Sequence, residues 1–246
     1  MRVDAQLSLP KGGCLAFPAE RVVQCLGSVD SNQVLELSAS FGRLVRDEQM
    51  GDGGRYRFRR FSRFTAVRTE HGWEVAVSEG HSILQSKEDN PLNGGVLRTY
   101  EPLESEILEC PLLLALIQHD IEIVERLEPE LFRLPVAIGV HQVRIAAQGQ
   151  TPGKPTPEGI HRDAERFTFQ HYWDRSGIVG GEFVAYDENK NQVFRWLQTE
   201  RFDSVLFTGT TWHSATPIRC LDERQEGFRD IFLIDFNPVS GIHPEV

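Results

Sequence analysis

Short apolar runs with a strand-like period fill the second half of the chain. They are rich in β-branched and aromatic residues, and clusters of Gly, Asp, Asn and Pro separate them. This pattern predicts an antiparallel β-sandwich or barrel. The runs are VAIGVHQVRIAA (136–147), RFTFQHYWD (166–174), GEFVAYD (181–187), QVFRWLQT (192–199), SVLFTGT (204–210) and IFLIDF (231–236).

The first half of the chain carries helical patterns. Apolar residues recur at helical spacing over 18–47, which predicts two short helices, with Asp30 and Ser31 as caps of the second. After the turn-rich segment 86–103, the strongest helical pattern covers 104–133 and is interrupted by prolines. We therefore expect helices packed outside a β-barrel.

No linker, repeat or low-complexity segment divides the chain, and 246 residues suit one domain of generous size. We expect a single domain over 1–246. A helical and strand extension would cover about 1–135, and the β-barrel core would cover about 136–238.

An arginine-rich stretch follows a glycine turn at 51–69. Tyr56 and Phe58 alternate with arginines, as in a strand with one polar face, and the alternation slips at Arg60 and Phe61, which predicts a bulge there. Five arginines lie between positions 55 and 63. We favour a solvated face for them, with anion binding as the alternative and nucleic-acid binding as a weaker third.

Composition narrows the function classes. A net charge of -10 argues against general affinity for nucleic acid or anionic membranes, because phosphate binding needs a positive surface. The 4 cysteines are scattered without metal-site spacing, and the N-terminal residues lack a signal-peptide pattern. No apolar run approaches the length of a membrane span. We expect a cytoplasmic protein that acts on a small molecule; a homo-oligomer stays open.

The candidate chemistry centres on GIHRDAERFTF, where His161 and Asp163 stand two residues apart. Residues i and i+2 of a strand point to one face, so both side chains can reach one ion. His213, in FTGTTWHSATPI, follows another apolar strand and offers a third ligand. Two imidazoles and a carboxylate form the facial triad of non-haem iron(II), which leaves positions for a cosubstrate and oxygen. A zinc hydrolase is less favoured because no HExxH helix occurs, and a kinase loop fails because Thr168 stands where Asn is required.

A 2-oxo acid bound to such an iron site would bring a second carboxylate into the barrel, and arginine is its best partner. Arg229, which opens the strand after His213, is the first candidate, and Arg219 is the second. The alternative is an arginine that only pairs with a loop carboxylate. Trp212 is next to the proposed ligand His213. It either forms a wall of the site, where it would contact substrate, or packs at the rim of the site.

Four segments together resemble the 2-oxoglutarate/Fe(II)-dependent dioxygenases, the family that includes bacterial L-isoleucine dioxygenase. They are TPEGIHRDAERFTF, GGEFVAYD, LFTGTTWHSATPI and FRDIFLIDF, and the similarity extends over most of residues 45–237. The resemblance implies a double-stranded β-helix, a jelly-roll or cupin-like barrel, with flanking N-terminal helices. It also implies that His161, Asp163 and His213 hold Fe(II), and that Arg229 binds the far carboxylate of 2-oxoglutarate.

The resemblance further implies hydroxylation of an unactivated C–H bond, with O2 consumed and succinate and CO2 released. Characterised relatives act on free aliphatic amino acids, and we expect His141 and Arg144 to orient the carboxylate of such a substrate. The alternatives are the same chemistry on a peptide or protein side chain, or a cupin-like binding protein without turnover. Ala164, Phe183 and Ile231 depart from the family pattern, and Ala164 and Phe183 are expected to alter the shape of the pocket.

Overall fold

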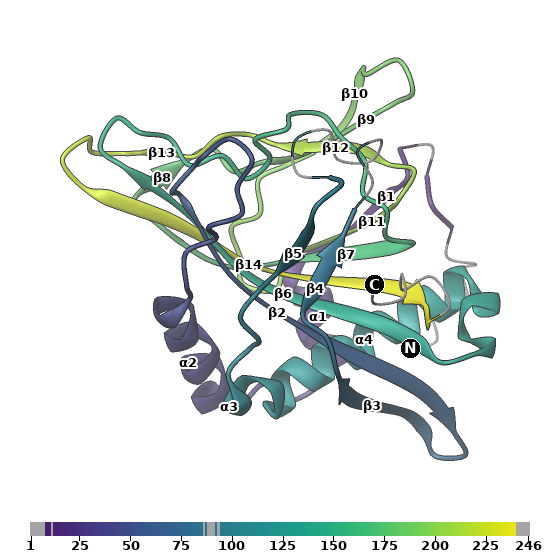
Figure 1. The fold of residues 1–246 in the computed structure, drawn as a ribbon. Helices are drawn as coiled ribbons and strands as arrows, with labels where there is room; N and C mark the ends of the chain where they lie inside the picture. The colour runs from purple at the N-terminus through teal and green to yellow at the C-terminus, as the bar shows by residue number, and fades with distance from the viewer. Residues whose placement is uncertain (1–7, 11, 86, 88–91, 93, 240–246) are drawn as a thin grey trace.

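A 7-stranded antiparallel sheet is the largest layer of the protein (Figure 1), and its strand order is β1-β11-β7-β14-β6-β2-β3. The computed structural model describes residues 8–10, 12–85, 87, 92 and 94–239. The strands of this sheet are β1 (Cys14–Phe17), β2 (Arg57–Thr69), β3 (Gly72–Ser78), β6 (Val136–Gln148), β7 (Phe167–Ser176), β11 (Ser204–Thr208) and β14 (Glu226–Pro238). β6 and β14 pair along their whole lengths and form the centre of the sheet.

Shorter strands lie over one face of the large sheet (Figure 1). The strands β9 (Phe183–Tyr186), β10 (Gln192–Trp196) and β12 (Trp212–Ala215) form a 3-stranded sheet; β8 (Ile178–Val179) pairs with β13 (Arg219–Cys220), and β4 (Ser82–Leu84) pairs with β5 (Leu97–Thr99). Two facing layers of antiparallel strands make the predicted jelly-roll, or double-stranded β-helix.

Helices cover the opposite face of the large sheet (Figure 1). They are α1 (Ala19–Leu26), α2 (Ser31–Ser40), the 3-10 turn η1 (Phe41–Arg43), α3 (Ser105–Leu108), α4 (Pro111–Leu127) and the 3-10 turn η2 (Pro129–Arg133). The main hydrophobic core lies between these helices and the sheet. Within the described parts of the chain, every helix is too short or too polar to cross a bilayer.

Strand alternation gives the large sheet two chemically different faces. In β14, Phe232 and Ile234 belong to the core beneath the helices, whereas Ile231 and Leu233 face the opposite layer of strands and line a cavity there. The sheet is therefore buried on both sides, which explains the near-continuous apolar runs of its central strands.

The predicted helices of the first half are confirmed. Asp30 caps α2, because its carboxylate accepts a hydrogen bond of 2.8 Å from the backbone N–H of Asn32. Prolines begin both α4 and η2, at Pro111 and Pro129. A proline lacks the N–H that a continuing helix would need, so each one starts a new element instead.

The predicted bulge in β2 is wrong. β2 pairs with β6 without a register shift from Arg57 to Ala66. The side chain of Phe61 shares the cavity-facing side of the strand with the arginines and stacks on His141, with ring centroids 4.3 Å apart. The apparent slip in the pattern is therefore an aromatic residue on a mostly polar face.

Candidate functional site

A cavity lies between the large sheet and the layer that contains β9 and β12. The inner faces of β2, β6, β7, β11 and β14 supply one wall, and the segment 155–165 supplies part of the other. His161, Asp163, His213, Arg229 and His141 all line this space. The structure thus brings together residues that lie up to 88 positions apart in the sequence, since 229 − 141 = 88.

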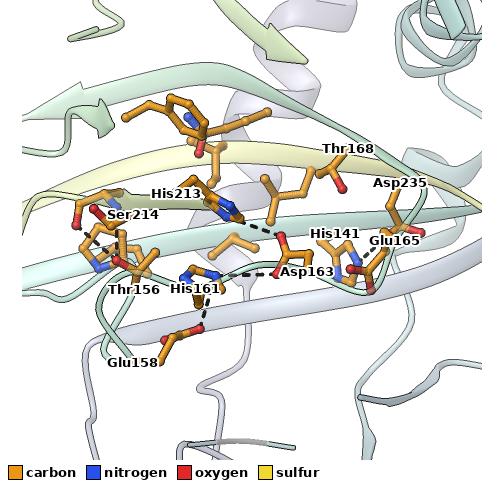
Figure 2. Close-up of a pocket in the computed structure, with 18 of the residues that line it drawn as sticks. His141, Thr156, Glu158, His161, Asp163, Glu165, Thr168, His213, Ser214 and Asp235 are labelled. Atoms are coloured by element: carbon orange, nitrogen blue, oxygen red, sulfur yellow. Dashed lines mark hydrogen bonds and ion pairs between the residues drawn. The ribbon is translucent and has the colours of Figure 1, made fainter. Parts of the chain in front are cut away.

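The three predicted metal ligands converge in the cavity (Figure 2). The Nε2 atom of His161 lies 3.5 Å from Oδ1 of Asp163, and the Nε2 atom of His213 lies 3.4 Å from Oδ2 of Asp163. One ligand atom from each residue lies within 4.8 Å of the other two. Ligand atoms that each bind at about 2.0–2.2 Å can share one ion at these separations.

Backbone pairing fixes the two histidines against each other. Each one donates its backbone N–H to the carbonyl of the other, at 3.0 Å and 2.9 Å, across an isolated antiparallel bridge. His213 belongs to β12, whereas Asp163 lies in the loop before β7. The expectation that His161 and Asp163 share a strand is therefore wrong; the bridge to β12, rather than strand alternation, aims His161 at the carboxylate.

Hydrogen bonds set the tautomer of both imidazoles. The Nδ1 atom of His161 lies 3.0 Å from the carbonyl oxygen of Gly159, and the Nδ1 atom of His213 lies 3.1 Å from that of Thr211. A carbonyl only accepts, so each Nδ1 carries a proton, and each Nε2, which faces Asp163, is the atom left to bind a metal. Metal-binding histidines are oriented in this way.

Charge in the cluster favours a cation. Burial lowers the pKa of His161, but the hydrogen bond and the charge of Asp163, together with the charge of Glu158, outweigh it and raise this pKa to about 9. Burial raises the pKa of Asp163, and the two imidazoles more than reverse this effect and hold it well below its usual range. Two nitrogen donors and one carboxylate fit the 2-His-1-carboxylate set that binds non-haem iron(II).

Arg229 is the second notable group in the cavity. Its side chain is 1% exposed, and burial lowers its pKa to about 10. Its Nη2 donates to Oε1 of Gln198 at 3.1 Å, whereas its Nε and Nη1 have no hydrogen-bond partner among the described residues. A buried guanidinium without a carboxylate is costly, so these N–H groups fit an anionic ligand such as the far carboxylate of 2-oxoglutarate.

Arg219 and Trp212 do not line the cavity, and both predictions are corrected. Arg219 is exposed and pairs through its backbone with Val179, while the neighbouring side chain of Ile218 points inward. Trp212 precedes His213 on β12, and successive strand residues point to opposite faces. Its ring therefore lies on the outer side, with the guanidinium of Arg162 4.4 Å from the ring centroid.

The two predicted substrate residues have different surroundings. His141 lines the cavity, with its Nε2 at 2.9 Å from Oδ2 of Asp235. Arg144 lies on the opposite face of β6, where it makes hydrogen bonds of 2.7 Å and 2.6 Å to Asp230 and packs over Phe228. The expectation that Arg144 orients a substrate is therefore corrected, because odd-numbered residues of β6 face the cavity and Arg144 is even-numbered.

Two of the three departures from the family pattern shape the cavity. Phe183 is 1% exposed and stacks against the ring of His213 at 5.8 Å, and Ile231 lines the cavity beside Arg229. Ala164 is exposed and does not line the cavity, so the expectation that it alters the pocket is wrong.

Arg98 lines the cavity and Gln198 supports Arg229, and neither residue is predicted from the sequence. Gln198 contacts Arg229 and is 1% exposed, and Arg98 is 4% exposed on β5. Gln198 comes just after β10, and Arg98 lies on β5 in a sequence segment rich in turn-forming residues; neither belongs to a motif of its own. The only signal was the presence of a polar residue next to an apolar strand, which is too common to select them.

Comparisons with known proteins identify the family of this chain. A family model described as 2OG-Fe dioxygenase matches residues 38–235. L-isoleucine-4-hydroxylase of Bacillus thuringiensis is 27% identical over 75% of this chain and 76% of its own length. The 3(1)-hydroxy-L-isoleucine 4-dioxygenase of Pantoea ananatis is 27% identical over 66% of each chain.

Solved structures show the same fold. A bsmA homolog from Methylobium petroleophilum PM1 superposes with a TM-score of 0.82 at 25% identity and covers 97% of both chains. The structure of IDO from Bacillus thuringiensis gives a TM-score of 0.78 at 22% identity, over 92% of this chain and 94% of the other. The predicted family, fold and cofactor class are confirmed: the chain belongs to the 2OG-Fe dioxygenase family, as an oxidoreductase that uses iron(II), 2-oxoglutarate and O2.

Proposed function

We propose that this protein hydroxylates an unactivated C–H bond of a free L-amino acid or a similarly small molecule. The observation that carries the proposal is the meeting of three iron-type ligands and a buried arginine, two of whose N–H-bearing atoms lack a partner among the described residues, in one cavity. Two relatives whose names describe hydroxylation of isoleucine or its derivative support the substrate class.

One group of residues binds the metal, and another binds the cosubstrate. His161, Asp163 and His213 hold iron(II), and Asp163 supplies the negative charge that balances part of the ion's own charge. Arg229 pairs with the far carboxylate of 2-oxoglutarate, and the carbonyl oxygen of the Gln198 side chain fixes the orientation of its guanidinium. Arg229 and the three metal ligands line the same cavity, so the cosubstrate would bind beside the metal.

Iron(II) bound at this site supplies the activation of O2. One oxygen atom enters succinate as 2-oxoglutarate loses CO2, and the other becomes the hydroxyl group of the product. The protein's own contribution is to bind, orient and exclude water from the reacting groups.

The remaining walls suit an aliphatic group. Val143, Ile231 and Leu233 come from the large sheet, and Phe183 and Phe207 lie beside His213. A mostly apolar wall with a few placed polar groups is typical of a small-molecule site. Phe183 fills space next to a metal ligand, so the position of the reacting carbon depends on it.

The proposal is tested by incubating the iron(II)-loaded protein with 2-oxoglutarate and O2 in the presence of free L-amino acids, or of short peptides that contain them. We expect one amino acid to gain one oxygen atom by mass spectrometry, with one succinate formed per product. Asp163→Ala should form neither. Oxidation of the peptides alone, or no coupled oxidation of any compound, would contradict the proposal.

A further inference from the structure

Two arginines from the extension line the same cavity as the iron ligands. Arg59 lies on β2 and Arg98 on β5, and both side chains reach the cavity. The expected solvated face for the arginines of β2 is wrong for Arg57 and Arg59. Arg57 is 8% exposed, Arg98 is 4% exposed, and the Nε atoms of Arg59 and Arg98 are buried.

Neither Arg59 nor Arg98 has a directly paired carboxylate among the described residues, and the charges of Asp47 and Glu165 act on Arg59 without an ion pair. Among the described residues, Arg98 donates to the side-chain oxygen of Gln85 at 2.6 Å, and Arg59 contacts the Nδ1 of His141. Neither forms an ion pair there, and the Nε of each has no hydrogen-bond partner. Arg57 differs, because its Nη2 lies 2.8 Å from the buried carboxylate of Asp47. Two guanidinium groups without a directly paired carboxylate thus border the cavity.

Arg59 is held in place by a neutral histidine. The Nε2–H of His141 donates to Oδ2 of Asp235 at 2.9 Å, so the Nδ1 of His141 accepts from the guanidinium of Arg59. Burial, and then the charge of Arg59, lower the pKa of His141 to about 4. The ring of Phe61 stacks on the ring of His141. This arrangement leaves His141 no free polar atom for substrate and makes it a positioning residue for Arg59.

Arg59 and Arg98 come from other strands than Arg229 does. β6 lies between β2 and β14 in the large sheet, and Arg57 and Arg229 occupy opposite sides of Ile145 in the register. Adjacent strands lie about 4.8 Å apart, so the backbones of β2 and β14 are separated by about 10 Å. Arg59 lies one row further along, across from Val143. One cavity therefore offers two anion-binding places on different strands.

We propose that Arg59 and Arg98 form an anion subsite that binds the carboxylate of the organic substrate, while Arg229 serves the cosubstrate. Planar guanidinium groups pair with a carboxylate through charge-assisted hydrogen bonds, and burial strengthens them. The inference rests on the proposed function and makes it sharper: the substrate must carry a free carboxylate, as a free amino acid does and an internal peptide residue does not.

The test measures binding without turnover. Protein loaded with Mn(II) and 2-oxoglutarate is titrated by calorimetry with L-isoleucine, L-leucine and L-valine, and with the amide of each. We expect at least one acid to bind at least about tenfold more tightly than its amide. Arg59→Gln and Arg98→Gln should each weaken binding of that acid by about tenfold to a hundredfold, the range for a lost hydrogen bond between charged groups. Both should change amide binding by less than about twofold.

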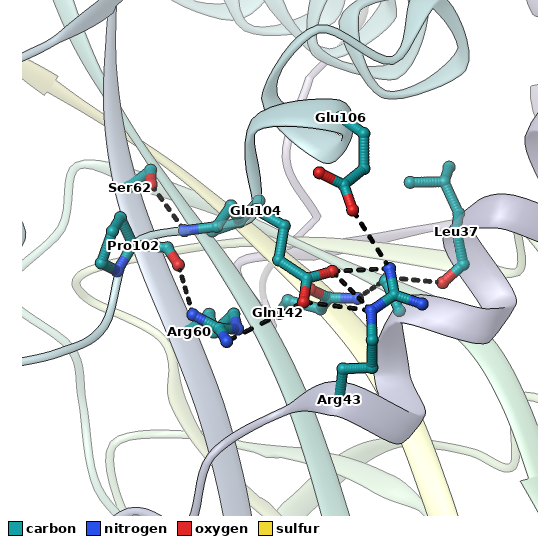
Figure 3. Close-up of polar contacts among 10 residues, drawn as sticks. Leu37, Arg43, Arg60, Ser62, Pro102, Glu104, Glu106 and Gln142 are labelled. Carbon is teal, nitrogen blue, oxygen red and sulfur yellow. Dashed lines mark hydrogen bonds and ion pairs between the residues drawn. The ribbon is translucent and has the colours of Figure 1, made fainter.

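Arg60→Gln is the matched control. Arg60 is next to Arg59 on β2 but points to the other face, where it donates to the carbonyl of Pro102 at 2.9 Å and lies 3.9 Å from Glu104 (Figure 3). It should leave the preference for acid over amide unchanged. Thermal unfolding verifies that each variant folds. If Arg98→Gln does not fold, Arg98→Lys replaces it, because lysine keeps the charge but lacks the planar guanidinium.

The outcomes separate the two proposals. If Mn(II)-loaded wild-type protein does not bind 2-oxoglutarate, the proposed function fails and the subsite proposal fails with it. If 2-oxoglutarate binds but no acid is preferred over its amide, only the anion subsite is overturned. The anion subsite would also be overturned if Arg59→Gln and Arg98→Gln both still bind the acid more tightly than its amide.

Discussion

Replacement of Arg229 by Gln should abolish most of the affinity for 2-oxoglutarate without harming the ligand-free fold. Arg229 is 1% exposed, and two of its N–H-bearing atoms, Nε and Nη1, lack partners among the described residues. In the ligand-free protein the guanidinium is a buried charge without a counter-charge, which is a cost to stability. Gln removes that charge, so the melting temperature of the ligand-free variant should equal or exceed that of the wild type.

The size of the affinity loss follows from the two unpaired donors. A hydrogen bond to a charged group contributes about 1.5–3 kcal/mol, so losing two costs about 3–5 kcal/mol when the pair is buried. Since about 1.4 kcal/mol is tenfold in Kd, the expected weakening is about a hundredfold to a few thousandfold. The metal held by His161, Asp163 and His213 would supply the affinity that remains.

Thermal unfolding of Mn(II)-loaded protein gives the assay. At a 2-oxoglutarate concentration of about 100 times the wild-type Kd, the ligand stabilises the native state by about 2.7 kcal/mol. Unfolding entropy of about 2.1 cal/mol/K per residue converts this into a rise of about 5 °C for a chain of 246 residues. A hundredfold weaker Kd leaves about 0.4 kcal/mol and a rise of about 1 °C.

Arg219→Gln is the matched control, because Arg219 is an exposed arginine outside the cavity. It should keep the full ligand-induced rise. A rise of about 5 °C in Arg229→Gln, or its loss in Arg219→Gln, would refute the assignment of Arg229 as the cosubstrate anchor.

Three further predictions concern groups around the anchor and the cavity wall. Gln198→Leu removes the acceptor of the 3.1 Å bond from Arg229, and calorimetry should show 2-oxoglutarate binding about tenfold weaker while the metal content is unchanged. Gly181→Ala places a Cβ 2.8 Å from Cδ of Arg229 at a φ of +81, and denaturant unfolding should show a loss of roughly 1–3 kcal/mol along with weaker 2-oxoglutarate binding. The pKa of His141 is lowered to about 4 from its ordinary 6.5, so the unfolded chain binds this proton more tightly than the native state does. The free energy of unfolding should therefore fall as the pH falls through the window from about 6.5 to about 4, by about 2 kcal/mol between pH 7 and 5, and His141→Gln should lack this component.

The sequence was most informative where local chemistry is strong. Helix boundaries at 18–47 and 104–133 followed from Asp30 and from prolines, since capping and the missing N–H act within a few residues. The metal ligands were found because His161 and Asp163 lie close together in a recognisable segment. His213 was found through the strand and turn that precede it.

The errors concern which way a side chain points. Arg144 lies on β6 and Arg229 on β14, both long central strands, where a shift of one residue moves a side chain to the other face of the sheet. Arg144 points away from the cavity and pairs with Asp230, whereas Arg229 points into the cavity. Arg59 was expected to be solvated because a charged strand face usually is. Only the tertiary structure shows that β5 and the opposite layer cover this face, since such coverage depends on pairing between residues far apart in the chain.

Iron(II) binding stoichiometry tests the central claim most directly. Under anaerobic conditions, equilibrium dialysis should give one iron(II) per wild-type chain and essentially none for Asp163→Ala, because the Asp163 carboxylate is the oxygen donor of the three-residue ligand set and lies between His161 and His213. Glu158→Gln is the control: its carboxylate lies 3.6 Å from Nε2 of His161, outside the proposed ligand set, and the variant should still bind one ion. Full iron binding by Asp163→Ala, or loss of binding in Glu158→Gln with Asp163 intact, would contradict the assigned metal centre.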